Sequence, residues 1–396
     1  MSHIAFLIPG LDRIAGAEAQ LLLLAEGLSQ RGHRISVIAM SGEGDVAGRQ
    51  LAACGCEFVA LRMRKGWADP RGWLRLAQWL RQQQPEVVHC HLPHAIWLGR
   101  CSRWLAPRRV QIDTLHTTAV GPDSRQRAFR WTEFLSDQVT AVSDAVRASQ
   151  LGHSVSCRQD FIVLPNAVDL ERWAAGTEKR LRQRAAFKIS DEEFLWIAAG
   201  RLEAVKDYPT LLNAFATLPT RARLLIAGSG PLAEALGRQI ESLELTGRVA
   251  LLGQRSDLAD LLPAADGFVQ ASLWEGMPMS LLEAGAVELP VVATNLPSIA
   301  GVVLDKETGF LAEPSHQESL AAAMRAMMEV PPEERASFGQ RARRLISENY
   351  ALARILDRWE ALYGALLADH PRPTRRGHAR NNAASRLRSE RPRMRP

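Results

Sequence analysis

The stretch that decides the fold runs from residue 194 to residue 232 and reads FLWIAAGRLEAVKDYPTLLNAFATLPTRARLLIAGSGPL. Two short apolar runs, FLWIAAG and RLLIAG, enclose a segment with a helical pattern, which indicates a strand–helix–strand unit. The same alternation fills the chain: HIAFLI, RISVIA, EVVHC, VQIDTL and QVTAV come before it, and RVALLG, GFVQA and VVAT come after it. This α/β alternation predicts parallel sheets covered by helices on both faces, with ligands bound at the carboxyl ends of the strands.

A break in this rhythm predicts two domains. Between residues 164 and 189 the pattern gives way to LPNAVDLERW and a charged stretch, and 396 residues are enough for two cores. We therefore expect a first Rossmann-like domain over 1–166 and a second over 167–349. Three helical patterns without intervening strands close the chain, and we expect 350–370 to pack back onto the first domain.

The charge of the chain is concentrated at its end. The formal net charge is +6, but residues 371–396 hold nine Arg and one Glu, which leaves the rest of the chain at about −2. This segment has almost no apolar residues to bury, so we expect a disordered basic tail. A nucleic-acid binder usually spreads its basic residues over a folded face, so no specific nucleic-acid binding is expected. Binding of nucleic acid through the tail remains an alternative function.

Targeting signals and cysteines give little further direction. The chain shows no signal peptide and no apolar run that could span a membrane, so we expect a cytoplasmic protein. Five cysteines without a C-x-x-C pair indicate reduced thiols rather than a disulfide framework.

Two carboxylates stand out in WEGMPMSLLEAG. Glu275 is expected in a loop before a helix that begins near Pro278, and Glu283 inside that helix. A helix N-terminus offers free N–H groups to phosphate or sugar oxygens, while carboxylates accept hydrogen bonds from hydroxyl groups. Taken alone, the two residues favour a capping Glu and an exposed helical Glu.

Cations and glycines follow two other predicted strands. Arg201 and Lys206 lie directly after FLWIAAG, where they could meet a diphosphate or remain a solvated loop. Gly228 and Gly230 form the turn in IAGSGP, which allows close approach of the backbone to a ligand or is only a tight connection.

Taken together, these motifs resemble family 4 glycosyltransferases. The resemblance rests on GRLEAVKDY, IAGSGPL, LGQRSDLADLL and WEGMPMSLLEAGAVELPVVATNLPSI, with IAGAEAQLLLLAEGL, VHCHLPH, VTAVSDAVR and LPNAVDLERW in the first half. It covers roughly residues 1–370, and the whole series is far more specific than any single motif. It implies a GT-B fold, in which the two domains face each other across a cleft.

The resemblance also implies residue roles. Arg201 and Lys206 correspond to the pair that binds the donor diphosphate and stabilises the leaving group. Glu283 corresponds to the ribose-binding Glu, Glu275 to the residue beside the donor sugar, and Gly16 to a close-approach glycine at the diphosphate. The donor-binding residues implied in this way are Gly16, Arg201, Lys206, Gly228, Gly230, Arg255, Glu275, Gly276, Met277, Pro278, Met279, Ser280 and Glu283.

Three polar residues of the first half are also implicated. His116, after VQIDTL, corresponds to the family's His near the transferred sugar and is placed with Glu275, Arg201 and Lys206 among the catalytic residues; taken alone it could be a strand-end His bonded to backbone. Asn166 in LPNAVD resembles an interdomain Asn with a structural role. Ser143 is expected to cap a helix.

The cluster His89, Cys90, His91 and His94 has residue types that can bind a metal ion. Alternate residues at a strand end can converge on zinc, but His89 and His91 share one face simply because strands alternate. The sequence has no Asp-x-Asp motif for a divalent ion. We therefore expect no metal and no cofactor, with Arg201, Lys206 and helix N-termini taking the ion's role.

The resemblance implies a retaining transfer of sugar from a nucleoside-diphosphate sugar, with UDP the commonest choice, to a glycan or lipid-linked acceptor in polysaccharide or glycolipid synthesis. The segment 62–81, RMRKGWADPRGWLRLAQWLR, combines basic residues with Trp67, Trp73 and Trp79. It could contact an anionic membrane surface or simply cover the sheet. A sugar-nucleotide epimerase of the same two-domain architecture is the alternative enzyme.

Overall fold

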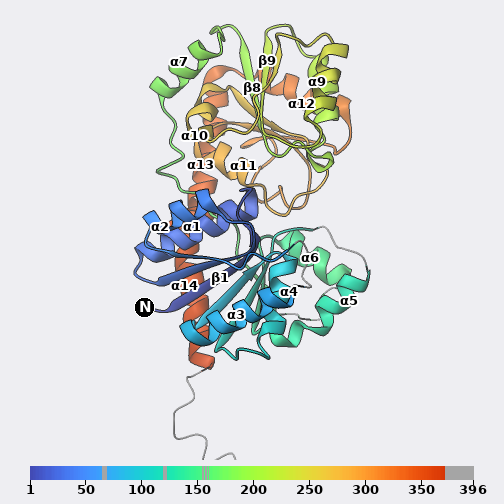
Figure 1. The fold of residues 1–396 in the computed structure, drawn as a ribbon. Coiled ribbons are helices and arrows are strands. Elements are labelled where there is room, and N and C mark those ends of the chain that lie inside the picture. Colours follow the sequence, from blue (N-terminus) through green and yellow to red (C-terminus); the bar gives the residue numbers. More distant parts are fainter. Residues whose placement is uncertain (65–68, 119–122, 154–155, 157, 159, 371–396) are drawn as a thin grey trace, which may run out of the picture.

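The computed structural model describes the chain except residues 65–68, 119–122, 154–155, 157, 159 and 371–396. The predicted disordered tail therefore lies outside the described residues. The described part forms two parallel sheets in two lobes, one above the other in Figure 1. Among the described residues, no helix is long and apolar enough to cross a membrane.

The first sheet has seven strands in the order β3-β2-β1-β4-β5-β6-β7. All neighbouring strands run parallel. This is expected, because strands such as Val110–Leu115 are buried along their whole length and must be covered on both faces. The strands are β1 (His3–Gly10), β2 (Arg34–Ser41), β3 (Glu57–Ala60), β4 (Val87–His91), β5 (Val110–Leu115), β6 (Gln138–Ala141) and β7 (Ile162–Val163).

Helices cover both faces of this sheet. One face packs against α1, α2 and the C-terminal helix α14, and the other packs against α3, α4, α5 and α6. The helices of the first lobe are α1 (Gly16–Gln30), α2 (Asp45–Ala53), α3 (Pro70–Gln83), α4 (Pro93–Ser102), α5 (Asp123–Trp131), the 3₁₀ turn η1 (Glu133–Leu135) and α6 (Asp144–Gly152).

The second sheet has six parallel strands in the order β10-β9-β8-β11-β12-β13. It lies between a cluster that includes α8, α9 and α12 and a second cluster that includes α11 and α13. Its strands are β8 (Phe194–Ala199), β9 (Ala222–Ala227), β10 (Val249–Leu251), β11 (Gly267–Gln270), β12 (Val291–Thr294) and β13 (Gly309–Ala312). Its helices are α7 (Thr177–Ala186), η2 (Ala204–Lys206), α8 (Tyr208–Ala216), α9 (Ala233–Ser242), α10 (Leu258–Leu261), η3 (Leu262–Ala264), α11 (Met279–Ala286) and α12 (Gln317–Glu329).

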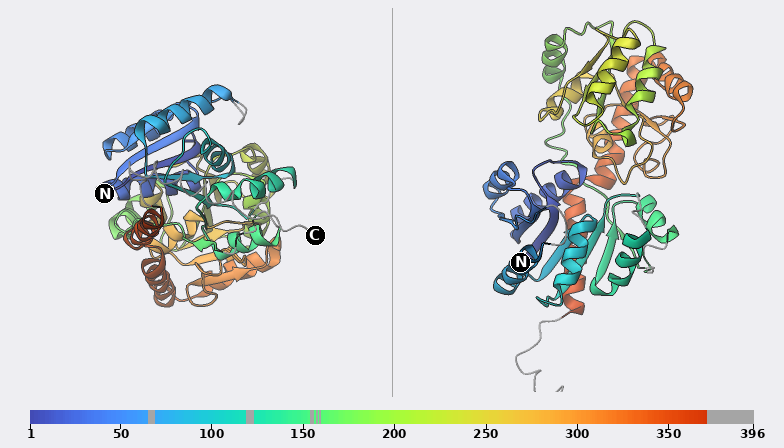
Figure 2. Two further views of the ribbon diagram at one scale, coloured as in Figure 1. Left: turned by 90° about the horizontal axis from the view of Figure 1, so that it is seen from below. Right: turned by 45° about the vertical axis from the view of Figure 1, so that its right-hand side comes forward.

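The chain then returns to the first lobe. Helix α13 (Pro332–Tyr350) packs on the second sheet, and Ala351 is extended and ends it. Helix α14 (Leu352–Asp369) buries Ile355, Leu356 and Trp359 in the core of the first lobe. Figure 2 shows this C-terminal helix, in red, beside the strands of the first lobe. The crossing predicted from the sequence is therefore present.

Two parallel-sheet Rossmann-like lobes with this return crossing make the GT-B fold that the motif series predicted. The sequence reading missed three strands, β3, β7 and β13. All three are short strands at the edges of their sheets and are mostly only partly buried, whereas β6, β11 and β12, of four residues each, are buried throughout and show a continuous apolar run.

Candidate functional site

The carboxyl ends of the two sheets meet at the loops that follow β5, β6 and β11. Ser143 Oγ donates a 2.7 Å hydrogen bond to the carbonyl of Gly276, and Thr118 Oγ1 lies 3.5 Å from the carbonyl oxygen of Glu275. A Cβ atom on Gly276 would lie 1.9 Å from the carbonyl oxygen of His116. Glycine is therefore required for this approach, and His116 and Glu275 come from facing lobes at the same junction.

The linker between the lobes also contacts the loop after β11, at Met277. The Asn166 side-chain amide donates to the Met277 carbonyl at 3.1 Å, and the Asn166 backbone N–H lies 3.2 Å from the Met277 sulfur. Ser143 also accepts a hydrogen bond from Val146 N–H, so it caps α6 as the sequence predicted. Asn166 and Ser143 thus both fix the Gly276–Met277 segment against the first lobe.

Lys206 and Glu275 form an ion pair inside the second lobe. Lys206 Nζ lies 2.5 Å from Glu275 Oε1, and the two side chains are only 15% and 11% exposed. The same carboxylate oxygen accepts hydrogen bonds from Ser272 Oγ at 2.6 Å and Gln270 Nε2 at 3.1 Å. Ser280 Oγ in turn donates to Gln270 Oε1 at 3.0 Å. One oxygen of Glu275 is therefore held by three donors.

The turn before α11 presents unused N–H groups. Among the described residues, the backbone amides of Gly276, Met277 and Met279 have no hydrogen-bond acceptor, and Pro278 has no N–H to offer. Free amides at a helix N-terminus, together with the helix dipole, attract phosphate and other anions. Of the four residues from 276 to 279 that the resemblance implies at the donor, three therefore have a free backbone N–H group. Pro278 is the N-cap residue, directly before the first residue of α11.

Glu283 lies one turn further along α11. Burial raises the pKa of its carboxyl group to about 7, and the more distant charge of Arg172 only partly opposes this. Its carboxyl group accepts no hydrogen bond from the described residues. A desolvated carboxylate without partners has unused capacity for hydroxyl donors.

The two arginines expected at the donor are paired within their own loops. Arg201 lies 2.8 Å from Glu203 and its side chain is largely exposed. Arg255 forms two parallel hydrogen bonds to Asp257, of 2.8 and 2.6 Å. Both lie in turns after strands of the second sheet, after β8 and β10 respectively, and both guanidinium groups remain accessible.

The glycines of the IAGSGP turn are required by the fold itself. A Cβ atom on Gly228 would lie 1.9 Å from the carbonyl oxygen of Gly200, and one on Gly230 would lie 2.5 Å from that of Leu202. The turns after β8 and β9 therefore pack backbone against backbone. Gly16 differs, because its added Cβ would only reach ordinary contact with Met279, at 3.6 Å from Cγ.

A row of histidine rings leads from the core of the first lobe to this junction. His91 Nδ1 lies 2.8 Å from His116 Nε2, and the His89 and His91 rings are 4.2 Å apart. His89 bonds Tyr363 of α14 and Thr114 of β5. Burial lowers the pKa of His116 to about 4, and it also lowers the pKa values of His89 and His91 well below 6.5. All three rings are therefore neutral near pH 7.

The His–Cys cluster at the end of β4 has a packing role. Cys90 Sγ accepts a hydrogen bond from Gln111 Nε2, and burial raises the pKa of its thiol to about 12. His94 is exposed at the start of α4. Within the described residues no group of three or more His, Cys, Asp or Glu side chains could hold a metal ion. The side chains of His89 and His91 instead meet neighbours from α14 and β5.

Two other surfaces lie apart from the junction. In α3, Trp73 and Trp79 pack against the core of the first lobe, so their side chains cover the sheet; Trp67 lies outside the described residues.

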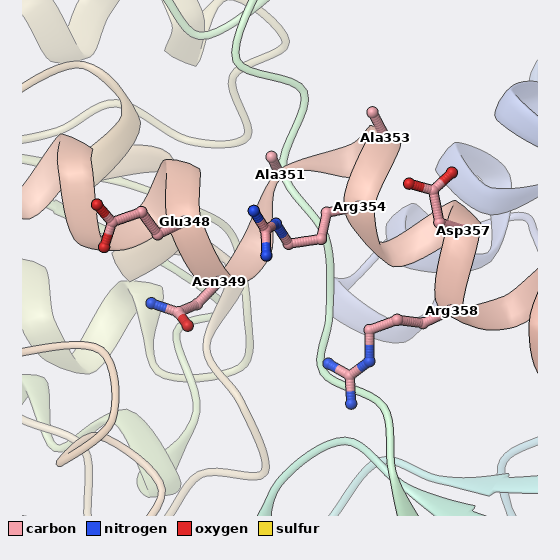
Figure 3. A pocket seen from close by; sticks show the side chains of 7 residues that line it. All are labelled: Glu348, Asn349, Ala351, Ala353, Arg354, Asp357 and Arg358. Atoms are coloured by element: carbon pink, nitrogen blue, oxygen red, sulfur yellow. The ribbon is translucent and has the colours of Figure 1, made fainter.

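A hollow of ≈ 600 Å³ lies at the break between α13 and α14, lined by the residues labelled in Figure 3. Two of its charged side chains tie α14 to the first lobe, because Asp357 pairs with Arg31 after α1 and Arg358 donates to the carbonyl of Val163 in β7.

Known proteins share this sequence and this fold. Residues 14–172 match the family Glycosyltransferase Family 4, and residues 179–345 match the family Glycosyl transferases group 1. N-acetyl-alpha-D-glucosaminyl L-malate synthase of Bacillus anthracis is 27% identical over 304 residues, which cover 74% of this chain and 78% of that protein. UDP-Gal:alpha-D-GlcNAc-diphosphoundecaprenol alpha-1,3-galactosyltransferase of Escherichia coli is 26% identical over 272 residues, 65% of this chain and 70% of that protein.

Solved structures agree on the fold. Anabaena Alr3699/HepE, solved in complex with UDP and glucose, superposes with a TM-score of 0.82 at 17% identity, covering 92% of this chain and 100% of that chain. Sucrose-phosphate synthase of Thermosynechococcus elongatus superposes with a TM-score of 0.81 at 19% identity, covering 93% and 100%. With both halves matched in order and the GT-B architecture in place, the chain belongs to the family 4 glycosyltransferases.

Proposed function

We propose that this enzyme moves a sugar, with retention of anomeric configuration, from a UDP-sugar to a hydroxyl group of a glycan or lipid-linked acceptor. The observation that carries the proposal is the meeting of Lys206, Glu275 and the free amides before α11 with His116 of the opposite lobe. This arrangement offers positive charge and N–H donors for a diphosphate, and carboxylates for sugar hydroxyls.

The relatives support the choice of substrates. The Escherichia coli relative is named for UDP-Gal and a diphosphoundecaprenol acceptor, and Alr3699/HepE was solved with UDP. We assign the donor to residues 167–349 and the acceptor to residues 1–166, with 350–370 as the return segment. Synthesis of a cell-surface polysaccharide or glycolipid, by a cytoplasmic enzyme that meets the membrane from its inner side, follows from such an acceptor.

The donor would be held by residues of both lobes. Lys206 keeps two N–H bonds for phosphate oxygens while the third points to Glu275, and the exposed Arg201 can leave Glu203 for the diphosphate. The amides of Gly276, Met277 and Met279 would bind phosphate or sugar oxygens, with Gly16 at close approach. Glu283 would accept from ribose hydroxyls, while the IAGSGP glycines, Arg255 and Ser280 would shape the walls of the donor site.

The reaction would use these groups without a metal ion. The acceptor hydroxyl attacks the anomeric carbon from the face of the departing UDP, the bond from that carbon to the phosphate oxygen breaks, and a phosphate oxygen takes the hydroxyl proton. Lys206, Arg201 and the α11 amides stabilise the negative charge on the leaving diphosphate. Because its pKa is about 4, His116 is neutral near pH 7, and it would donate or accept a hydrogen bond at the sugar rather than act as a charged imidazolium.

A thermal-melting panel tests the proposal. We expect UDP and one UDP-sugar to raise the unfolding temperature, because a ligand that binds the folded state stabilises it by mass action. Lys206→Met should abolish the shift, whereas Lys179→Met, at the ion pair with Asp260, should keep it. No shift with any nucleotide sugar contradicts the proposal. Conversion of the UDP-sugar to its epimer without acceptor would favour the epimerase instead.

A further inference from the structure

A buried amide side chain stands at the end of a strand in the second sheet. Gln270 is the last residue of β11, and it is only 5% exposed. A buried amide needs partners at both ends, because a polar group without a partner destabilises the fold. Gln270 Nε2 donates to Glu275 Oε1 at 3.1 Å, and Gln270 Oε1 accepts from Ser280 Oγ at 3.0 Å. Gln270 therefore connects Glu275 to the first turn of α11.

These hydrogen bonds run in one direction. If the Gln270 amide were turned round, its oxygen would face the Glu275 carboxylate, and two acceptors would meet without a proton between them. The amide of Gln270 thus donates to Glu275, and the hydroxyl proton of Ser280 is committed to Gln270. Ser280 is therefore occupied with the orientation of Gln270 and has no proton left for a ligand.

The donors around Glu275 all meet one of its two oxygens. Lys206 Nζ, Ser272 Oγ and Gln270 Nε2 lie at 2.5, 2.6 and 3.1 Å from Oε1. A carboxylate oxygen has about two lone pairs, so three donors fill its capacity. Glu275 Oε2 accepts no hydrogen bond from the described residues. The network thus fixes which oxygen is used inside the protein and which is left for a ligand.

The turn that carries this network is anchored to other elements. Ser272 is fully buried, and its carbonyl accepts a 2.6 Å hydrogen bond from Thr294 Oγ1 at the end of β12. The N–H group of Leu273 donates to the carbonyl of Val205 in η2 at 2.8 Å. The orientation of the Glu275 carboxylate is therefore set by β11, β12, η2 and α11 together, rather than by the loop alone.

A shielded oxygen that is held in one orientation can discriminate between ligands. The Glu275 side chain is only 11% exposed, so water reaches Oε2 poorly. A hydroxyl group placed at Oε2 makes a hydrogen bond to a charged acceptor, which is stronger than a bond between neutral groups. A ligand that fills the site without such a hydroxyl leaves Oε2 desolvated and without a donor, which weakens its binding.

We propose that Gln270 is a positioning residue for Glu275: with Ser280 it holds Glu275 Oε1, and so presents Oε2 to a hydroxyl group of the donor sugar. This inference rests on the proposed function, because it takes the donor sugar to lie beside Glu275. Its consequence is specific. Gln270 should affect the binding of a UDP-sugar but not the binding of UDP, which has no sugar hydroxyl at this place.

Calorimetric titration of the full chain with UDP, UDP-glucose, UDP-galactose and UDP-N-acetylglucosamine tests the inference. Gln270→Met has a side chain of similar length without the amide group. It should weaken binding of the UDP-sugar that the wild-type chain binds most tightly at least about fivefold, and change UDP binding by less than about twofold. Ser280→Ala, at a half-buried position that tolerates the change better, should give a smaller loss with the same selectivity.

A matched control separates this effect from a general loss of packing. Gln138 is another buried glutamine at a strand of a parallel sheet, but its amide donates to the carbonyls of Val139 and Asp160 in the first lobe. Gln138→Met should leave the affinities for UDP and for the UDP-sugar in their wild-type ratio. The unfolding temperatures of both Met variants show the cost in stability independently of ligand.

A double variant tests whether Gln270 acts through Glu275. In the Glu275→Gln background the carboxylate is absent, so Gln270→Met should cause little further loss of UDP-sugar affinity. A further loss as large as in the wild-type chain would overturn the inference. So would an unchanged UDP-sugar affinity in Gln270→Met and Ser280→Ala, or an equal loss for UDP and the UDP-sugar. A wild-type chain that binds neither UDP nor any of the three UDP-sugars would overturn the proposed function instead.

Discussion

Lys206 Nζ lies 2.5 Å from Glu275 Oε1, within one lobe and across 69 residues of sequence. The pair explains why a cation can sit ready in a largely buried position before any diphosphate arrives. Glu275 balances the charge of Lys206, while Ser272 and Gln270 fix the orientation of the carboxylate. A bound diphosphate would contact Lys206 while Lys206 keeps its ion pair with Glu275.

This ion pair should show strong coupling in a double-mutant cycle. Lys206→Ala leaves the Glu275 carboxylate nearly buried without its cation, and we expect a loss of unfolding free energy on the order of 3 kcal/mol. Lys206→Ala combined with Glu275→Gln should recover much of this loss, because no unpaired charge remains. Denaturant unfolding of the single and double variants measures the coupling, and strictly additive losses would rule out the pair. Lys206→Ala and the double variant should both lack transfer activity.

Gly276 should not tolerate a side chain. Gly276→Ala would put Cβ against the His116 carbonyl, at 1.9 Å in the present backbone, so the Glu275 loop or the facing lobe has to move. A displacement of about 1 Å at the reacting groups reduces the rate by roughly 100-fold. Gly237→Ala in α9, with no atom within 4 Å of the added Cβ, should keep full activity and slightly raise stability. Equal activity of the two alanine variants in a transfer assay would argue against the close approach.

His91 should orient His116. His91 Nε2 is buried and has no hydrogen-bond partner. A buried N–H group without an acceptor costs more free energy than a buried lone pair without a donor. We therefore expect the His91 proton on Nδ1, which donates it in a hydrogen bond to His116 Nε2. His91→Ala should then lower kcat about tenfold or more, with a smaller loss for His91→Asn, which keeps an N–H donor. Steady-state kinetics in both substrates distinguishes the two variants, and an unchanged kcat in His91→Ala would sink the orienting role.

Glu283 should make stability depend on pH near neutrality. Its pKa rises from 4.5 to about 7 on folding, so the folded state holds a proton that the unfolded state has lost. The carboxylate therefore destabilises the fold increasingly as the pH rises from 4.5 through 7. Glu283→Gln should raise the unfolding temperature at pH 8 and change it little at pH 4.5, while weakening UDP binding. A stability gain that is the same at both pH values would contradict the raised pKa.

The sequence predicted the fold because buried parallel strands must be short, apolar runs between helical patterns. FLWIAA and VQIDTL are recognisable for that reason, whereas EFVA of β3 and GFLA of β13 lie at sheet edges and are only partly buried, so they show no continuous apolar run. The return of α14 was also predictable, from helices without strands after residue 317.

The site was only partly predictable. Lys206 and Glu275 were recognised through the motif series, but their contact joins loops after β8 and β11 and depends on strand order, which no local pattern encodes. The role of His91 was missed for a similar reason, because a His–x–His strand end indicates a metal site as readily as a hydrogen bond to a neighbouring loop. Likewise, α3 combines tryptophans and arginines, yet only packing shows which face is covered.

The position of UDP in a crystal structure of this chain tests the central claim most directly. We expect the diphosphate to contact Lys206, Arg201 and the amides before α11, with the ribose hydroxyls on Glu283 and the Lys206–Glu275 pair still in place. UDP bound elsewhere, or a diphosphate that makes no contact with Lys206, would contradict the proposed donor site.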